Sequence, residues 1–211
     1  MHIADGILEA EIAVAGFGGS IGLIIYSLKN SKTRENFFRE VPKISVITAA
    51  LFIASLLSIP VGPTTVHFSF VGLAGILLGP MAVLAVSIAL IMQLILFSHG
   101  GFSTLGVNIF NFALAALAAH YIFKFNYIPF LQNTNNKIKA FLSAALATLL
   151  KIIGTSLALY MSGFPAFVGL SLTAVHVPII IAEGILTALI TVTLLKKRKE
   201  LFQNEQAAGN R

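Results

Sequence analysis

The chain has 211 residues, of which 57% are hydrophobic and 10% charged, and its mean hydropathy is +0.91. Soluble globular domains carry about 25% charged residues, so this composition excludes an ordinary soluble domain and predicts a membrane protein. The formal charge of +6 does not indicate nucleic-acid binding, because the basic residues gather in loops between apolar runs.

Seven apolar runs follow one another along the chain, and each predicts one transmembrane helix. They cover residues 10–28, 44–59, 66–78, 80–98, 105–123, 138–161 and 173–195. We therefore expect a single all-α membrane domain over 1–211, with an N-terminal segment 1–9 and a tail 196–211. The opening does not resemble a signal peptide, so we expect the mature chain to begin at Met1.

The 14 Lys and Arg residues predict how these helices are oriented. They fall in the segments 29–43, 124–139 and 196–211, and Lys151 is the only one elsewhere. The positive-inside rule places all three segments in the cytoplasm. With seven crossings, the N-terminus then lies outside and the C-terminus inside.

The run 66–78 is the shortest, and as a helix it spans about 20 Å against a hydrocarbon core of about 30 Å. Merging it with 80–98 would put the first two basic segments on opposite sides of the membrane. We therefore expect Gly79 and Pro80 to separate two helices, one of them short or tilted.

The five histidines are the residues most able to bind a metal, because the chain has no cysteine. His2, His67, His99 and His176 lie near the predicted outer face, and His120 lies at the inner end of its run. We expect His176 to be a structural residue and His120 to be a histidine at the membrane interface. Imidazole nitrogen suits nickel, copper, zinc and iron.

His2 is informative because of its position in the chain. The α-amine, the amide nitrogen of residue two and the Nδ1 of its imidazole can form adjacent five- and six-membered chelate rings in one plane. A deprotonated amide favours square-planar Ni(II) or Cu(II). Alone, a histidine at position two is weak support, since an exposed histidine without a function is the ordinary alternative.

Four segments resemble the NikM/CbiM family, the substrate-binding membrane (S) subunits of energy-coupling-factor (ECF) nickel and cobalt transporters, and are most like NikM. They are MHIADGIL at 1–8, TTVHFSFVGLAGILLGP at 64–80, HGGFSTLGVNIFNFALA at 99–115 and VHVPIIIAEGILTAL at 175–189. The resemblance covers nearly the whole chain in the family's order and spacing. It implies a six-helix core with an extra N-terminal helix in the prokaryotic cytoplasmic membrane.

This resemblance also implies the ligands and the partners. Ni²⁺, or alternatively Co²⁺, would bind the amine of Met1, the amide and imidazole of His2, and the imidazole of His67. The implied partners are a transmembrane coupling (T) protein, two cytoplasmic ATPases and a small accessory membrane subunit. The chain has no Walker-type phosphate loop, so we expect a transporter subunit that does not hydrolyse ATP itself.

Other residues are expected to support such a site. Ser69, His99 and Asn108 are candidates to accept the second N–H of a ligating imidazole. Lys151 and Glu183 lie at similar depths of the membrane and predict a structural ion pair, because an isolated charge there is costly.

Ala50 and Ala54 have the small-xxx-small spacing that allows a close helix contact, either with a partner or within the chain.

Three rival functions remain open from the sequence. A zinc or copper carrier is a weaker candidate, an intramembrane metalloenzyme would need an HExxH-like pair that the chain lacks, and a vitamin-binding relative would not need the His-bearing N-terminus.

Overall fold

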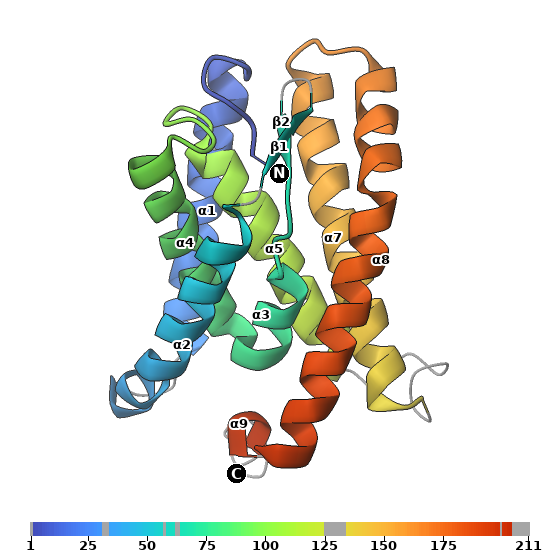
Figure 1. Ribbon diagram of the computed structural model, residues 1–211. Coiled ribbons are helices and arrows are strands. Elements are labelled where there is room, and N and C mark those ends of the chain that lie inside the picture. The colour runs from blue at the N-terminus through green and yellow to red at the C-terminus, as the bar shows by residue number, and fades with distance from the viewer. Residues whose placement is uncertain are drawn as a thin grey trace.

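The computed structural model describes residues 2–30, 34–56, 58–61, 64–124, 134–198 and 200–203. Long helices pack side by side, with a two-stranded hairpin among them (Figure 1). Within the described residues, five apolar helical stretches are long enough to cross a bilayer, which confirms a multi-pass membrane protein. They are α1 Ala10–Asn30, Val71–Phe97, α5 Leu105–Lys124, α7 Asn136–Met161 and α8 Ala166–Lys197.

The second predicted run, 44–59, lies partly in α2, which spans Arg34–Ala54 and so begins and ends earlier than expected. Charged residues such as Arg, Lys and Glu are good helix formers, so apolarity alone does not mark where the helix begins. After α2 the chain forms a hairpin of β1 Ile59–Val61 and β2 Thr64–Val66, with Ile59 opposite Val66. The all-α prediction is wrong here, because a run of β-branched residues favours strands.

The predicted helix 66–78 is also shorter than expected. Val66 belongs to β2, residues 67–70 are not helical, and α3 spans only Val71–Leu78. All eight residues of α3 are buried. A helix of this length is about 12 Å long, so α3 is a short helix inside the bundle.

Gly79 ends α3, as the sequence predicts. Its φ of 56° lies in the left-handed region that favours glycine, and Pro80 follows within the 3-10 turn η1 Gly79–Met81. The next helix, α4 Ala82–Phe97, runs back toward the end of the bundle that holds the hairpin (Figure 1). The number of crossings and the outward direction of the N-terminus stay predictions.

The C-terminal helices lie within two residues of their predicted bounds except at the start of α8. α8 begins at Ala166, directly after Pro165, whereas the apolar run was expected to start at 173. Pro165 suits the position before a helix because its φ of −60° is already fixed. Beyond α8, a single turn, α9 Glu200–Gln203, lies within the predicted tail.

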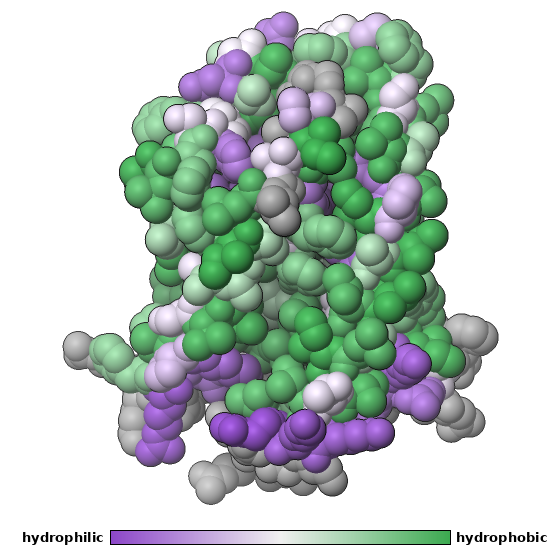
Figure 2. Space-filling model, viewed as in Figure 1, coloured by the Kyte–Doolittle hydropathy of each residue, from purple (hydrophilic) through white to green (hydrophobic). Residues whose placement is uncertain are grey.

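Hydrophilic side chains gather at one end of the bundle (Figure 2). The end of α1, the start of α2, the end of α5, the start of α7 and the end of α8, which carry basic residues, meet at this end (Figure 1). The surface beyond them is largely hydrophobic, with Val14, Ile95 and Leu170 each more than 70% exposed. Such a surface suits lipid.

α5 is the central helix and contacts α1, α3, α4 and α7. It approaches α1 closely, since a Cβ on Gly16 would overlap Val107 and a Cβ on Gly106 would overlap the main chain of Phe17. Glycine at such contacts lets two helix backbones come together. The start of α5 is thereby held directly against α1.

Candidate metal centre

The segment before α1 folds back among the helices, beside the hairpin (Figure 1). His2 is 2% exposed and Ile3 is fully buried. Met1, whose amine is one of the expected ligands, lies outside the described residues. Burial of this segment requires that its main-chain polar groups find partners.

Residues at the start of α5 supply those partners. The Oδ1 of Asn108 accepts a hydrogen bond from the main-chain N–H of Ile3 at 3.0 Å, and its Nδ2 donates to the carbonyl of Ile3 at 3.2 Å. The hydroxyl of Thr104 donates to the same carbonyl at 2.6 Å. The main chain next to His2 is therefore fixed by two side chains.

Asp5 makes a second attachment to the loop before α5. Its Oδ1 accepts hydrogen bonds from the main-chain N–H of Ser103, at 2.9 Å, and from the Ser103 hydroxyl. These bonds lower the pKa of Asp5. Gly101 allows the contact, since a Cβ there would overlap the main chain of Asp5.

His67 lies between β2 and α3 and is 3% exposed. Its Nδ1 bonds to the carbonyl of Phe68 at 2.8 Å, which makes Nδ1 the N–H donor and leaves the lone pair on Nε2. That Nε2 faces the Nδ1 of His2 at 3.1 Å. The planes of the two rings differ by 12°.

The distance between the two imidazole nitrogens suits a shared metal ion. Metal–nitrogen bonds of about 2.0–2.1 Å place donors at neighbouring corners of a square about 2.9 Å apart. The Nδ1 of His2 is also the ring nitrogen that a chelate with the amide of residue two requires. The structure thus brings together two of the expected donors with the right atoms facing each other.

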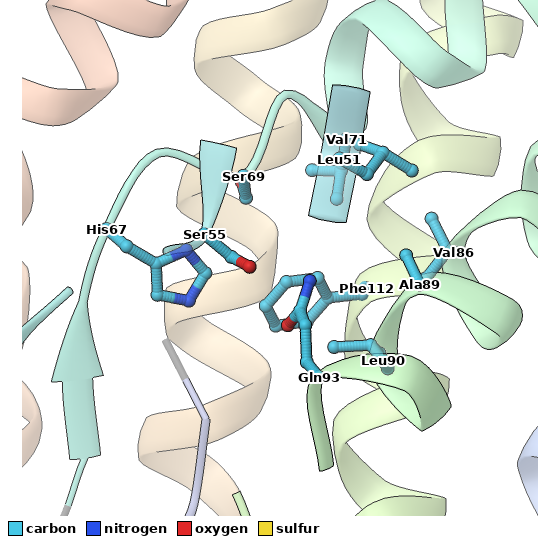
Figure 3. A pocket seen from close by; sticks show the side chains of 10 residues that line it. All are labelled: Leu51, Ser55, His67, Ser69, Val71, Val86, Ala89, Leu90, Gln93 and Phe112. Carbon is cyan, nitrogen blue, oxygen red and sulfur yellow. The ribbon is translucent and has the colours of Figure 1, made fainter. Parts of the chain in front are cut away.

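Phe112 of α5 lies beside both rings, with its centroid 5.4 Å from that of His2 and 6.3 Å from that of His67. A small pocket adjoins His67 and is lined by Phe112, by other apolar side chains, and by Ser55, Ser69 and Gln93 (Figure 3). These largely apolar walls limit the access of water to His67. Neither Phe112 nor Gln93 was expected from the sequence, where each is one more residue of an apolar run.

Burial lowers the pKa of His2 well below its usual value of 6.5, while the interaction with the side chain of Gln93 acts in the opposite direction. The pKa of His99 is also lowered, first by burial. Both imidazoles are therefore neutral at pH 7, and a neutral imidazole is the form that binds a metal.

The three residues expected around the ligands have different partners. Asn108 binds the main chain of Ile3. Ser69 bonds to Glu183 and Lys151. The Nε2 of His99 lies 3.4 Å from the hydroxyl of Ser58, and its ring centroid is 6.2 Å from that of His2. Thr104, which was not expected, shares the contact with Ile3; the sequence carries no signal for it.

Lys151 and Glu183 are both buried and lie close together, but they are joined through Ser69 and not by a direct contact. The Nζ of Lys151 donates to the Ser69 hydroxyl at 2.7 Å, and that hydroxyl lies 3.0 Å from the Oε1 of Glu183. Thr148 donates to the Oε2 of Glu183 at 2.6 Å. Lys151 also lies over the ring of Phe112, 4.9 Å from its centroid.

The remaining candidates have other surroundings. His176 is buried within α8, where its Nδ1 bonds to the carbonyl of Leu172, and His120 packs against Tyr121. On α2, Ala50 is exposed and Ala54 is half-buried.

Among the described residues, no three His, Cys, Asp or Glu side chains form a metal-binding group. A site that includes His2 and His67 therefore needs further donors, such as main-chain nitrogens.

Comparison with known proteins gives an independent view of the chain. The family described as CbiM, cobalt uptake substrate-specific transmembrane region, matches residues 2–201. The cobalt transport protein CbiM of Acetoanaerobium sticklandii is 34% identical over 217 residues, which cover 95% of this chain and 86% of that protein. A protein of Archaeoglobus fulgidus named as a fused nickel transport protein, NikMN, is 29% identical over 219 residues, which cover 99% of this chain and 70% of that protein.

A solved crystal structure described as that of a transition metal transporter has the same fold. Its TM-score is 0.84, with 20% sequence identity and full coverage of both chains. A structure described as a truncated transition metal transporter has a TM-score of 0.83, also at 20% identity, and covers 93% of this chain. At this identity the likeness concerns the fold.

Proposed function

Because the chain belongs to the CbiM family and is a substrate-specific membrane component for cobalt or nickel uptake, we propose that it captures Ni²⁺ outside the cell. The ion binds in a square of four nitrogens. These are the α-amine of Met1, the main-chain nitrogen and Nδ1 of His2, and the Nε2 of His67.

The observation that carries this proposal is the 3.1 Å separation between the Nε2 of His67 and the Nδ1 of His2. It brings the lone pair of one buried imidazole to the nitrogen through which the other would close its chelate ring. The hydrogen bond from His67 to Phe68 supports the same assignment, because a ligating imidazole usually donates its second N–H to a fixed acceptor.

Release of the ion into the cell requires energy, which we propose comes from ATP hydrolysis by partner subunits. They are a transmembrane coupling protein, two cytoplasmic ATPases and a small accessory membrane subunit. The exposed Ala50 and the half-buried Ala54 of α2 offer a small-residue surface for the coupling protein.

Co²⁺ is the second candidate, and the cobalt transport proteins among the relatives favour it. The same four nitrogens can hold either ion. Nickel is preferred here because Ni²⁺ exceeds Co²⁺ in intrinsic affinity and accepts a square plane of nitrogen donors.

Isothermal titration of Ni²⁺ and Co²⁺ against the purified protein tests the site. One preparation has a native N-terminus, and the other carries two additional residues before Met1. We expect the native form to bind Ni²⁺ more tightly than Co²⁺ and to turn yellow and diamagnetic, and the extended form to lose this binding. Equal binding by both preparations would exclude the amine as a ligand, and tighter binding of Co²⁺ would favour the second candidate.

A further inference from the structure

The N-terminus of α3 has no cap from its own segment. Phe70 occupies the cap position with a φ of 47° and makes no side-chain hydrogen bond to the helix. The first N–H groups of a helix have no partner within it, and leaving such groups unpaired in a buried place is costly. The start of α3 therefore needs an acceptor from elsewhere in the fold.

Glu183 of α8 supplies an acceptor for one of these groups, the N–H of the cap residue Phe70, and for the N–H of Ser69 before it. Its Oε1 accepts hydrogen bonds from the main-chain N–H of Ser69 and, at 3.2 Å, from that of Phe70. The same oxygen lies 3.0 Å from the Ser69 hydroxyl. A carboxylate at this end of a helix is also favoured by the helix dipole.

These contacts bear directly on the segment 67–70, which begins with the proposed ligand His67. Ser69 and Phe70 come two and three residues after His67, and the Nδ1 of His67 is itself bonded to Phe68. The four residues from His67 to Phe70 thus run without a break from the imidazole pair to the carboxylate. If the carboxylate loses its hold on Ser69 and Phe70, His67 loses its fixed position.

We propose that Glu183 is a positioning residue for the metal site: it caps α3 from across the bundle and thereby holds the Nε2 of His67 against the Nδ1 of His2. Lys151 has a different part, which is to balance the buried charge of Glu183 through Ser69. This proposal rests on the proposed function of His2 and His67. It differs from the expected structural ion pair, in which only the charges would matter.

Two double variants separate these roles. Removing one buried charge alone destabilises the fold, because it leaves the other uncompensated, so Glu183 and Lys151 are changed together. Lys151→Met with Glu183→Gln removes both charges but keeps an oxygen that can accept from Ser69 and Phe70. Lys151→Met with Glu183→Ala removes both charges and the acceptor.

Binding of Ni²⁺ is measured by titration of each full-length variant with a native N-terminus, together with its absorption spectrum. We expect the Gln double variant to keep the yellow diamagnetic form with affinity within about threefold of the wild type. The Ala double variant should lose about 10- to 100-fold in affinity, the range typical for partners of metal ligands. Equal affinities in the two double variants would overturn the proposal.

A second readout needs no metal. Hydrogen exchange of the metal-free protein, followed by mass spectrometry of a peptide that contains Ser69 and Phe70, should show lost protection in the Ala double variant only. Unchanged protection there would refute the cap even if the wild type bound Ni²⁺ as proposed. Conversely, lost protection with a wild type that binds no Ni²⁺ would refute the proposed function and leave the cap standing.

Thr191→Val is the matched control. Thr191 is fully buried on the same helix as Glu183, and its hydroxyl has no hydrogen-bond partner. We expect this variant to match the wild type in both measurements. If Thr191→Val lost as much Ni²⁺ affinity and exchange protection as the Ala double variant, any change among the buried residues of α8 would disturb the site. This result would count against a specific role for Glu183.

Discussion

The side chain of Asn108 pairs with the main chain of Ile3 as a neighbouring strand would, through its Oδ1 at 3.0 Å and its Nδ2 at 3.2 Å. These two atoms satisfy both polar groups of a residue that is fully buried. Since Ile3 directly follows His2, the pairing fixes where the imidazole of His2 enters the bundle.

Asn108→Ala should weaken Ni²⁺ binding by about 10- to 100-fold, as is typical when a partner near a metal ligand is lost. The N–H of Ile3 would be left buried and unpaired, at a cost of about 1–3 kcal/mol, and the segment 2–9 would leave its site more often. Titration of Ni²⁺ measures the effect. Asn111→Ala, one turn further along α5, is the control and should bind normally; equal affinities in both variants would show that Asn108 does not hold the segment.

Gly101→Ala should also weaken the site. The new Cβ would overlap the main chain of Asp5, and overpacking of this kind costs about 1–3 kcal/mol. If the segment 2–9 is displaced to relieve the overlap, the affinity for Ni²⁺ falls by about 5- to 150-fold. Gly18→Ala on α1 has open space around its Cβ and should leave the affinity unchanged. Normal binding by the Gly101 variant would mean that the segment tolerates a shift.

The two histidines nearest His2 should differ sharply in importance. His67→Ala removes a proposed ligand and should reduce the affinity for Ni²⁺ by more than about 100-fold, beyond the loss typical of outer partners. His99→Ala should change it by less than about tenfold, because the Nε2 of His99 faces Ser58 and its ring is further from His2. Titration of both variants checks this order, and a larger loss for His99 would place the ion elsewhere.

Acid should release the N-terminal segment from the metal-free protein. Burial holds the pKa of His2 well below 6.5 in the bundle, whereas the released segment exposes an imidazole with a pKa of about 6.5. The released form therefore binds more protons as the pH falls through 6.5, and protonation favours it. Hydrogen exchange of the segment 2–9, corrected for the intrinsic rate, should show less protection at about pH 5.5 than at about pH 7.5. His2→Asn should reduce this difference, and equal protection at both pH values would contradict it.

The membrane character and most helices could be predicted from the sequence, because apolar runs of sufficient length have few alternatives to crossing a bilayer. The break at Gly79 was predictable for a local reason as well, since glycine and proline interrupt helices wherever they fall. The hairpin 59–66 was not predicted. Each strand is only three residues long, and the β-branched residues that favour strands are too few to distinguish the hairpin from a connecting loop until the two strands pair.

The sequence by itself determined the chemistry available to this protein: it has no thiolate, it has a histidine at position two, and its segments resemble a family of metal carriers. Tertiary structure decided which side chains meet. Small shifts between helices decide whether Asn108 forms a hydrogen bond with an imidazole or with the main chain of Ile3. They also decide whether Lys151 and Glu183 touch directly or through Ser69. Hydrogen bonds act over about 3 Å, and only the packing of residues about a hundred positions apart sets such distances.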